Sequence, residues 1–240
     1  MIPRKIHYCW FGDKQIPPLA QDCIATWHGH MPHWDYCLWD ERSFDVNSTP
    51  YTMEAYASGN YAFVSDYVRL WALEREGGVY LDVDFAVYKP FDDLLQHHAF
   101  AGFEGSKHHP LMMGVCASEP HGEWVREMLC AYQDRHFLTF DGAPDLTTNV
   151  QYVTAKMASN GFRQDGTEQD YRDLHILPVD YFSPRQTTGE YFLTANTYCE
   201  HKGLKSWSTG TPAWKEYIKK IVGGKNMTRL IKMKRRLENL

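Results

Sequence analysis

The chain of 240 residues has no long hydrophobic run, no close cysteine pair and no excess of basic charge. About 20 consecutive apolar residues are needed to cross a bilayer, so the sequence predicts no membrane-spanning helix. The formal net charge of −5 disfavours nucleic acid as a partner. No apolar signal-peptide core begins the chain, because Gly12, Asp13 and Lys14 interrupt it early.

The cysteines show no C-x-x-C spacing; they are Cys9, Cys23, Cys37, Cys116, Cys130 and Cys199. Several lie within apolar patterns, which is typical of buried, reduced thiols. Disulfides are rare in the cytosol, so this usage and the missing signal peptide together favour a cytoplasmic protein.

Composition and length predict one folded domain. Hydrophobic residues make up 43% and charged residues 23%, as in ordinary globular proteins. A chain of this length can bury a sizeable core, and no repeat or low-complexity segment divides it. We expect a catalytic domain over residues 1–212 and a basic helical tail over residues 213–240.

Residues 61–90 carry the strongest local pattern. An apolar stripe at helical spacing is formed by Val64, Val68, Trp71 and Ala72. Asp66 and Arg69 lie three residues apart beside this stripe, and therefore share a helix face. Gly77 and Gly78 predict the end of the helix, because glycine tolerates the left-handed backbone found there.

A short buried strand, Val79 to Leu81, follows the glycines and ends in Asp82 and Asp84. Isolated D-x-D patterns are common and are mostly solvated turns. In open α/β sheets, however, ligands bind at the carboxyl ends of strands. Two carboxylates at such an end suit Mn²⁺ or Mg²⁺, especially when a substrate diphosphate supplies further oxygens.

The run SDYVRLWALEREGGVYLDVD resembles the core motif of glycosyltransferase family 32, the DXD sugar-binding enzymes. This family includes fungal initiating mannosyltransferases, bacterial capsule and lipopolysaccharide sugar transferases, and relatives of clostridial glucosylating toxins. The opening IPRKIHYCWFG resembles the family's first strand. The likeness covers roughly the first half of the chain. It implies a GT-A-like α/β domain with a mostly parallel, mixed sheet and helices on both faces.

The resemblance also implies roles for five residues. Trp10 would stack on the nucleotide base, although a core aromatic is the alternative. Asp66 would bind ribose or sugar hydroxyls and Arg69 the donor sugar or its phosphate; the alternative is a helix-surface ion pair. Asp84 is expected to ligate the metal directly. Asp82 is expected to reach the metal through water, or to hold the sugar and ribose.

Residues 198–207 resemble the closing loop of related GT-A transferases, with histidine, glycine, lysine and tryptophan in order. The spacing is shorter than in the glycogenin-like family. The implied roles are His201 on the metal or diphosphate, Lys205 on phosphate and Trp207 as a lid over the donor. Closure of such a loop excludes water and favours transfer over hydrolysis. The alternative is a surface loop with one buried tryptophan.

The tail combines many lysines and arginines with apolar residues on both sides of Gly223-Gly224. A basic amphipathic helix can lie on an anionic membrane surface. The equal alternative is a terminal helix packed on the domain. The first reading would place the protein peripherally on the inner face of the cytoplasmic membrane.

The function implied by the resemblance is metal-dependent, retaining transfer of a hexose from a nucleotide-sugar, with UDP favoured over GDP. The acceptor would be a glycan or lipid-linked glycan in surface polysaccharide synthesis. Two alternatives stay open. The run LDVDFAV also resembles haloacid-dehalogenase-like phosphatases, with Asp82 as nucleophile and Asp84 as acid/base. A calcium-dependent sugar-binding module would leave Trp10 and Arg69 unexplained.

In the second half, we expect a helix over Gly122–Phe137 and another over Thr148–Met157. Asp165–Asp173 is polar and predicts a loop. Tyr191–Thr194 predicts a short strand.

Overall fold

The computed structural model describes residues 1–105, 108–185 and 191–204. Residues 1–204 form one compact unit. The expected domain boundary at residue 212 and the basic tail therefore lie outside the described residues.

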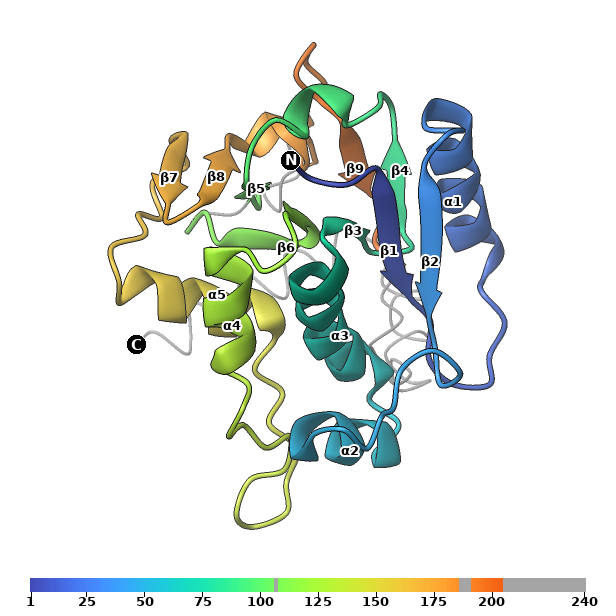
Figure 1. The fold of residues 1–240 in the computed structure, drawn as a ribbon, viewed down its shortest axis with the longest axis vertical. Helices are drawn as coiled ribbons and strands as arrows, with labels where there is room; N and C mark the ends of the chain where they lie inside the picture. The colour runs from blue at the N-terminus through green and yellow to red at the C-terminus, as the bar shows by residue number, and fades with distance from the viewer. Residues whose placement is uncertain (106–107, 186–190, 205–240) are drawn as a thin grey trace, which may run out of the picture. The chain divides into compact units, whose positions relative to one another are not determined.

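Seven strands of the described chain form one mixed sheet in the order β2-β1-β3-β6-β5-β8-β7 (Figure 1). They are β1 (Lys5–Cys9), β2 (Asp35–Trp39), β3 (Gly78–Leu81), β5 (Ala99–Phe103), β6 (Leu111–Ser118), β7 (Gln169–Tyr171) and β8 (Leu174–Leu177). The pairings give β1, β2, β3, β5 and β8 a common direction, against which β6 and β7 run. A separate antiparallel ribbon pairs β4 (Phe85–Val87) with β9 (Cys199–His201).

Helices cover both faces of the sheet, as expected. They are α1 (Pro18–His30), α2 (Pro50–Ala57), α3 (Tyr61–Glu76), α4 (Glu123–Cys130) and α5 (Asn149–Ala158), with 3₁₀ turns at Asp92–Leu94 and Val179–Tyr181. One buried cluster joins α2, α3, α4 and α5 to the sheet, and the second joins α1 and the β4–β9 ribbon to it. None of the described helices is long and apolar enough to cross a membrane.

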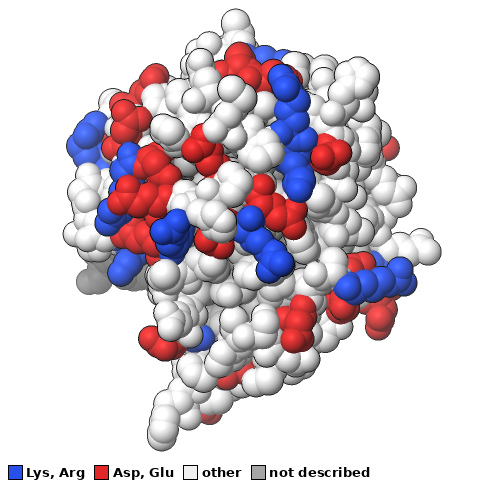
Figure 2. All heavy atoms as spheres, viewed as in Figure 1, with Lys and Arg blue, Asp and Glu red and all other residues white. Residues whose placement is uncertain are grey.

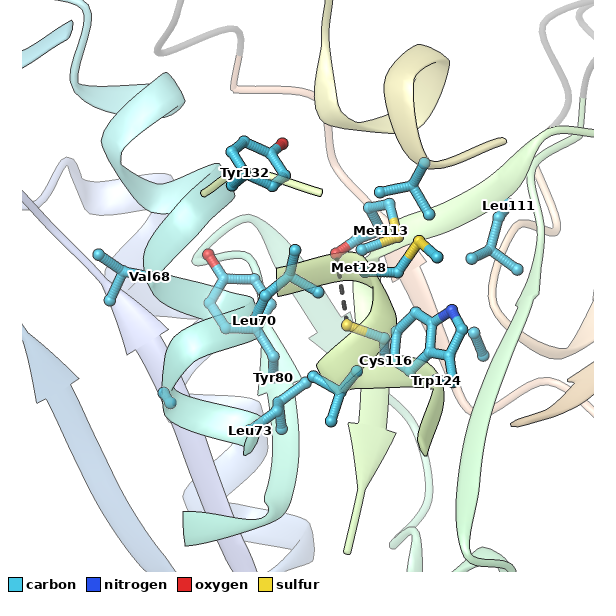
Figure 3. Close-up of a cluster of buried hydrophobic side chains, with 14 of the residues drawn as sticks. Val68, Leu70, Leu73, Tyr80, Leu111, Met113, Cys116, Trp124, Met128 and Tyr132 are labelled. Carbon is cyan, nitrogen blue, oxygen red and sulfur yellow. Dashed lines mark hydrogen bonds between the residues drawn. The ribbon is translucent and has the colours of Figure 1, made fainter. Parts of the chain in front are cut away.

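The core beneath α3 and α4 fixes the end of β3 (Figure 3). Tyr80 of β3 is paired with Cys116 of β6 and belongs to the same buried cluster as Leu73 of α3 and Trp124 of α4. These side chains are almost fully buried. Burial of each large apolar side chain contributes roughly 1.5–3 kcal/mol. The strand that carries the DXD motif is therefore held rigidly.

Two glycines connect α3 directly to β3. Gly77 and Gly78 have φ angles of +63° and +117°. A Cβ on Gly77 would lie 2.5 Å from Pro120, and one on Gly78 would lie 2.7 Å from the carbonyl oxygen of Lys5. Only glycine fits both the backbone and the space. The predicted helix, glycine stop and buried strand are confirmed.

Three expectations for the second half were wrong. The helix expected over Gly122–Phe137 ends at Cys130, where the Tyr152 hydroxyl takes the Ala131 carbonyl as acceptor at 2.6 Å. The loop expected over Asp165–Asp173 contains the edge strand β7, whose alternation of buried and exposed residues is hidden by its polar composition. Tyr191–Thr194 forms no strand; Tyr191 makes only an isolated bridge with Arg185. Neither β5 nor β9 was expected.

Candidate functional site

The site residues follow strands that end at the same edge of the sheet. β1 and β3 are parallel neighbours with Ile6 opposite Val79 and His7 opposite Tyr80. The next positions along both strands lead to Trp10 and Asp82. Trp10 is half-buried rather than part of the core, and its indole nitrogen donates to the carbonyl of Lys14. A half-exposed ring at this edge is compatible with the predicted base platform, which stays a prediction.

Asp66, Arg69 and Asp82 form a cluster, called here the Arg69 cluster, in which Asp66 and Arg69 are largely buried and Asp82 is 34% exposed. Arg69 Nη2 lies 2.8 Å from Asp66 Oδ1 and 3.3 Å from Asp82 Oδ1. The side chains of Asp66 and Arg69 are only 13% and 6% exposed. A helix-surface ion pair is therefore wrong for Asp66 and Arg69: the arginine joins the helix to the DXD motif.

Backbone and ring contacts hold the guanidinium in place. Arg69 Nη1 donates to the Met113 carbonyl at 2.6 Å, and its Cζ lies 4.6 Å from the centre of the Tyr80 ring. The Tyr80 hydroxyl donates to Asp82 Oδ1 at 2.9 Å. Arg69 is thus an oriented cation whose position is set before any ligand binds.

Burial raises the pKa of Asp66 to about 6, against the opposing charge of Arg69 and with a further upward contribution from Asp82. The backbone N–H of Asn149, the first residue of α5, donates to Asp66 Oδ2 at 3.2 Å. Asn149 could face the site, but the sequence alone gives no reason to place it there. The capping box of Thr148 and Gln151 is the sequence feature that could have identified it. This box starts the helix at Asn149 and directs the Asn149 backbone amide toward Asp66.

His201 and Asp84 form a second contact, called here the His201 pair. His201 Nε2 lies 2.9 Å from Asp84 Oδ2 across a separation of 117 residues. The backbone N–H of Leu204 donates to the same oxygen at 2.8 Å. In the β4–β9 ribbon, Phe85 is opposite His201 and stacks on its ring at 4.9 Å. The structure thus brings the predicted histidine to the DXD motif.

Charge coupling within the His201 pair favours the ionised forms. Burial acts to raise the pKa of Asp84, but hydrogen bonds and charge from His201, with the Leu204 amide, lower it overall. Burial acts to lower the pKa of His201, yet the Asp84 carboxylate raises it overall.

The donor set at the DXD motif fits a hard divalent cation. Tyr80 and Arg69 both reach Oδ1 of Asp82, while His201 and Leu204 both reach Oδ2 of Asp84. One oxygen of each carboxylate is free of these bonds. Two carboxylate oxygens with a nearby imidazole are ligands that Mn²⁺ accepts.

In the described part of the chain, the group of three metal-ligand types whose ligand atoms lie within 4.8 Å of one another is His7, Cys37 and Glu76, away from the DXD motif. Trp39 Nε1 donates to His7 Nδ1 at 3.0 Å, so the ring proton is on Nε2, which donates to the Gly77 carbonyl at 2.7 Å. Both imidazole nitrogens are thus engaged, and this group does not fit a metal.

Glu104 was missed because β5 was missed. It follows β5 at the same edge of the sheet. Burial raises its pKa, while the charge of His201 acts to lower it and that of Asp82 acts to raise it. Glu104 therefore faces both groups. An apolar pentapeptide with glycine, AFAGF, gave no periodicity that could identify its strand.

Behind Asp66 lies a set of buried polar atoms without hydrogen-bond partners among the described residues. They are Tyr51 Oη, Tyr132 Oη, Arg135 Nη1 and Asn149 Oδ1. The Arg135 guanidinium lies 4.8 Å and 5.1 Å from the ring centres of Tyr51 and Tyr132. Polar atoms left unpaired in this way mark a place for buried water.

Residues 17–101 match the family model described as the glycosyltransferase sugar-binding region containing a DXD motif. This stretch of the chain is therefore similar to the sugar-binding region of the DXD glycosyltransferases. The match includes Asp66, Arg69, Asp82 and Asp84, but their individual roles stay predictions. The α/β sheet with helices on both faces agrees with this family resemblance. The predicted phosphate and lid residues Lys205 and Trp207 lie outside the described residues.

The curated relatives of this DXD chain are longer. Glucan organizing enzyme 1 of Cryptococcus neoformans var. grubii is 34% identical over 174 residues, which is 59% of this chain and 46% of that protein. Inositol phosphoceramide mannosyltransferase 1 of Schizosaccharomyces pombe is 33% identical over 106 residues, which is 41% of this chain and 33% of that protein. The chain thus spans less than half the length of either relative.

Solved glycosyltransferases show a partial structural likeness to the DXD chain. The PaToxG glycosyltransferase has a TM-score of 0.44 and 19% identity. The superposed region covers 63% of this chain and 69% of the PaToxG chain. GlyE of Streptococcus pneumoniae has a TM-score of 0.41 and 10% identity. The superposed region covers 68% of this chain and 45% of the GlyE chain.

Proposed function

We propose that the chain transfers a hexose from a nucleoside diphosphate sugar to a glycan acceptor, with a divalent cation bound at Asp84 and Asp82. The supporting observation is that Arg69 cross-links the helix carboxylate Asp66 to Asp82 at the carboxyl edge of the sheet, with His201 beside Asp84. A DXD-family region covers the motif.

Charge balance favours a cation in this proposal. Arg69 is compensated by Asp66 and Asp82, so the described site has no spare positive charge for a diphosphate. A bound Mn²⁺ or Mg²⁺ would neutralise the charge that develops on the leaving diphosphate. Asp66, once ionised, can accept hydrogen bonds from sugar or ribose hydroxyls. Trp10 is proposed to stack on the base.

The donor is proposed to be a UDP-hexose or GDP-mannose. The motif resemblance favours UDP, whereas two relatives are named as mannosyltransferases. Calorimetric titration of UDP and of GDP, each with Mn²⁺ and with chelator, tests this on the full chain. We expect metal-dependent binding of one nucleotide, and loss of that binding in Asp84→Ala.

Asp35→Ala is the matched control. Asp35 is an exposed carboxylate at the start of β2, at the opposite end of the parallel strands from the DXD motif. It should bind like the wild type. Absence of binding for both nucleotides, with turnover of a generic phosphate ester, would refute the transferase and support the phosphatase alternative. Sugar binding that depends on Ca²⁺ but not on nucleotide would support the binding module.

The acceptor is proposed to be a lipid-linked glycan of surface polysaccharide synthesis, met at the inner face of the cytoplasmic membrane. The basic amphipathic sequence of the tail supports this location. Co-sedimentation of the full chain with vesicles containing anionic lipid should exceed that with neutral vesicles. Equal sedimentation would refute the membrane proposal and leave the transfer proposal intact.

A further inference from the structure

A closed hairpin projects beyond the site end of the molecule. Residues 137–147 leave the body as the yellow-green loop at the bottom of Figure 1, the end toward which β1 and β2 run. Thr139 N donates to the Ala143 carbonyl at 2.8 Å, and Asp145 N donates to the Phe137 carbonyl at 2.7 Å. Gly142, at φ +79°, supplies the left-handed turn residue. The hairpin is thus held by its own backbone.

Charged side chains anchor the base of the hairpin. Glu54 of α2 accepts hydrogen bonds from Phe137 N at 2.9 Å and Leu138 N at 3.0 Å. On the other strand of the hairpin, Arg135 Nη2 donates to Asp145 Oδ2 at 3.1 Å. A loop fixed at both legs presents its tip in a defined place.

The hairpin runs directly into the site. Its last residue, Thr147, is followed by the helix cap Thr148 and then by Asn149. The Asn149 backbone N–H donates to Asp66 Oδ2 at 3.2 Å, and its side-chain amide donates to the Asp66 carbonyl at 3.0 Å. A single residue, Thr148, therefore separates the hairpin from a direct contact with Asp66.

The tip carries an unusual exposed aromatic. Phe140 is fully exposed, and Leu146 near the base of the hairpin is 62% exposed. The projecting end is mostly uncharged in Figure 2, with acidic groups beside it. The Thr139 hydroxyl donates to Asp141, and this bond lowers the pKa of Asp141, which keeps it anionic at neutral pH.

The chemistry of the tip suits a sugar better than a membrane. An aromatic face packs against the C–H groups of a pyranose, and neighbouring carboxylates accept hydrogen bonds from its hydroxyls. The carboxylate of Asp141, next to Phe140, would instead be repelled by anionic headgroups. A fully exposed phenylalanine on a well-anchored turn is available to stack on a ligand.

We propose that the hairpin of residues 137–147 is the acceptor-docking element, with Phe140 stacked on a sugar ring of the acceptor glycan. This inference rests on the proposed function for the identity of the glycan as an acceptor. It assigns donor chemistry to the sheet edge and acceptor affinity to the hairpin tip.

Two kinetic readouts on Phe140→Ala separate these roles. Hydrolysis of the nucleotide-sugar without acceptor should stay within twofold of wild type. The KM for acceptor should rise about 5- to 10-fold, measured with a panel of p-nitrophenyl hexosides and disaccharides. Phe140→Tyr should restore the KM, since it keeps the ring. Phe192→Ala is the matched control, because Phe192 is also exposed, at 50%, outside the hairpin.

A direct binding measurement removes the dependence on turnover. In full chain labelled with fluorophenylalanine, the resonance lost in Phe140→Ala is that of Phe140. It should shift on titration with the same glycans. No shift, or equal acceptor KM for Phe140→Ala and Phe192→Ala, would refute the inference. Vesicle binding that is lost only in Phe140→Ala would refute it in favour of a lipid surface. If the chain bound no nucleotide but the Phe140 resonance still shifted with glycan, the transferase proposal would be refuted and glycan docking at the hairpin would be supported.

Discussion

The Arg69 cluster and the His201 pair lie at the same sheet edge but are built differently. Asp66 and Arg69 are 13% and 6% exposed, and the guanidinium is fixed by the Met113 carbonyl and the Tyr80 ring. His201, by contrast, is 50% exposed and is held by one carboxylate and one stacked ring. The first is part of the core, whereas the second lies on a short two-stranded ribbon.

The difference suggests a division of labour between stability and ligand binding. A buried charge that loses its partner is costly, so the Arg69 cluster must contribute to folding as well as to any donor contact. In the His201 pair the histidine is 50% exposed and Asp84 only 10%, so the imidazole can exchange partners when a ligand arrives while the carboxylate keeps the Leu204 amide. Variants in the two groups should therefore separate these two effects.

Replacement of Arg69 should give the largest effect. Arg69→Met leaves Asp66 and Asp82 without their buried cation and the Met113 carbonyl without its donor. We expect a loss of roughly 3–5 kcal/mol in the free energy of unfolding, measured by urea denaturation. Arg172→Met, which breaks the ion pairs of a surface arginine with Glu123 and Glu127, should cost far less. Equal losses of unfolding free energy in Arg69→Met and Arg172→Met would contradict a structural role for the Arg69 cluster.

Gly114→Ala should disturb both groups at once. The added Cβ would lie 2.6 Å from the Phe85 ring and 2.8 Å from Asp82 Oδ2, so the residue under His201 and the DXD carboxylate must both shift. We expect a destabilisation of about 1–3 kcal/mol and at least tenfold weaker metal-dependent nucleotide binding by calorimetry. Gly29→Ala, in α1 with nothing within 4 Å, should be neutral or stabilising. Unchanged nucleotide affinity in Gly114→Ala would show that nucleotide binding does not depend on the positions of Phe85 and Asp82.

The pH dependence of Asp66 should have opposite signs for activity and stability. Because the pKa is raised to about 6 in the folded chain, transfer that needs the carboxylate should fall as pH drops below about 6. The folded state binds the proton more tightly than the unfolded state. The stability supplied by this group is therefore present below pH about 4 and lost as pH rises through about 6.

Asp66→Asn removes this titration. Relative to wild type, its free energy of unfolding should improve by about 2 kcal/mol between pH 4.5 and pH 7.5 in urea titrations. A pH-independent difference would show that Asp66 is ionised throughout.

His201→Asn should give the smallest change in stability. The change should cost about 1 kcal/mol, because Asp84 is only 10% exposed but keeps the Leu204 amide, and the asparagine amide can still donate to it. Metal-dependent nucleotide affinity should fall about tenfold, because the imidazole orients Asp84 or ligates the ion. His98→Asn, which breaks the exposed pair with Glu119, should change neither quantity. A large loss of stability in His201→Asn would remove the distinction between the two groups.

Local signals predicted the first half of the site well. The stripe of α3, the paired glycines and the strand before Asp82 are all encoded within about one helix and one strand, so periodicity placed them correctly. Helical spacing also placed Asp66 and Arg69 on one face. It could not show that this face is buried, because burial depends on β6, which supplies the Met113 carbonyl.

Contacts between distant segments escaped sequence reasoning. The motif resemblance named His201, but not the ribbon with β4 that carries it. Glu104 was lost with β5, and Asn149 acts through a backbone amide that side-chain chemistry does not reveal. The edge strand β7 was taken for a loop because polar residues carry its alternation. Such features follow from tertiary pairing, which a single sequence does not specify.

The Gly77-Gly78 junction limits how such a protein can diversify. Because Gly77 and Gly78 join α3 to β3 without a loop, an insertion there would move Arg69 relative to Asp82 and break the contact between them. The hairpin of residues 137–147 projects from the body and can change in length without moving the sheet. New specificities should therefore arise by exchange of the hairpin on a constant frame. Grafting this loop between homologues is the corresponding engineering route.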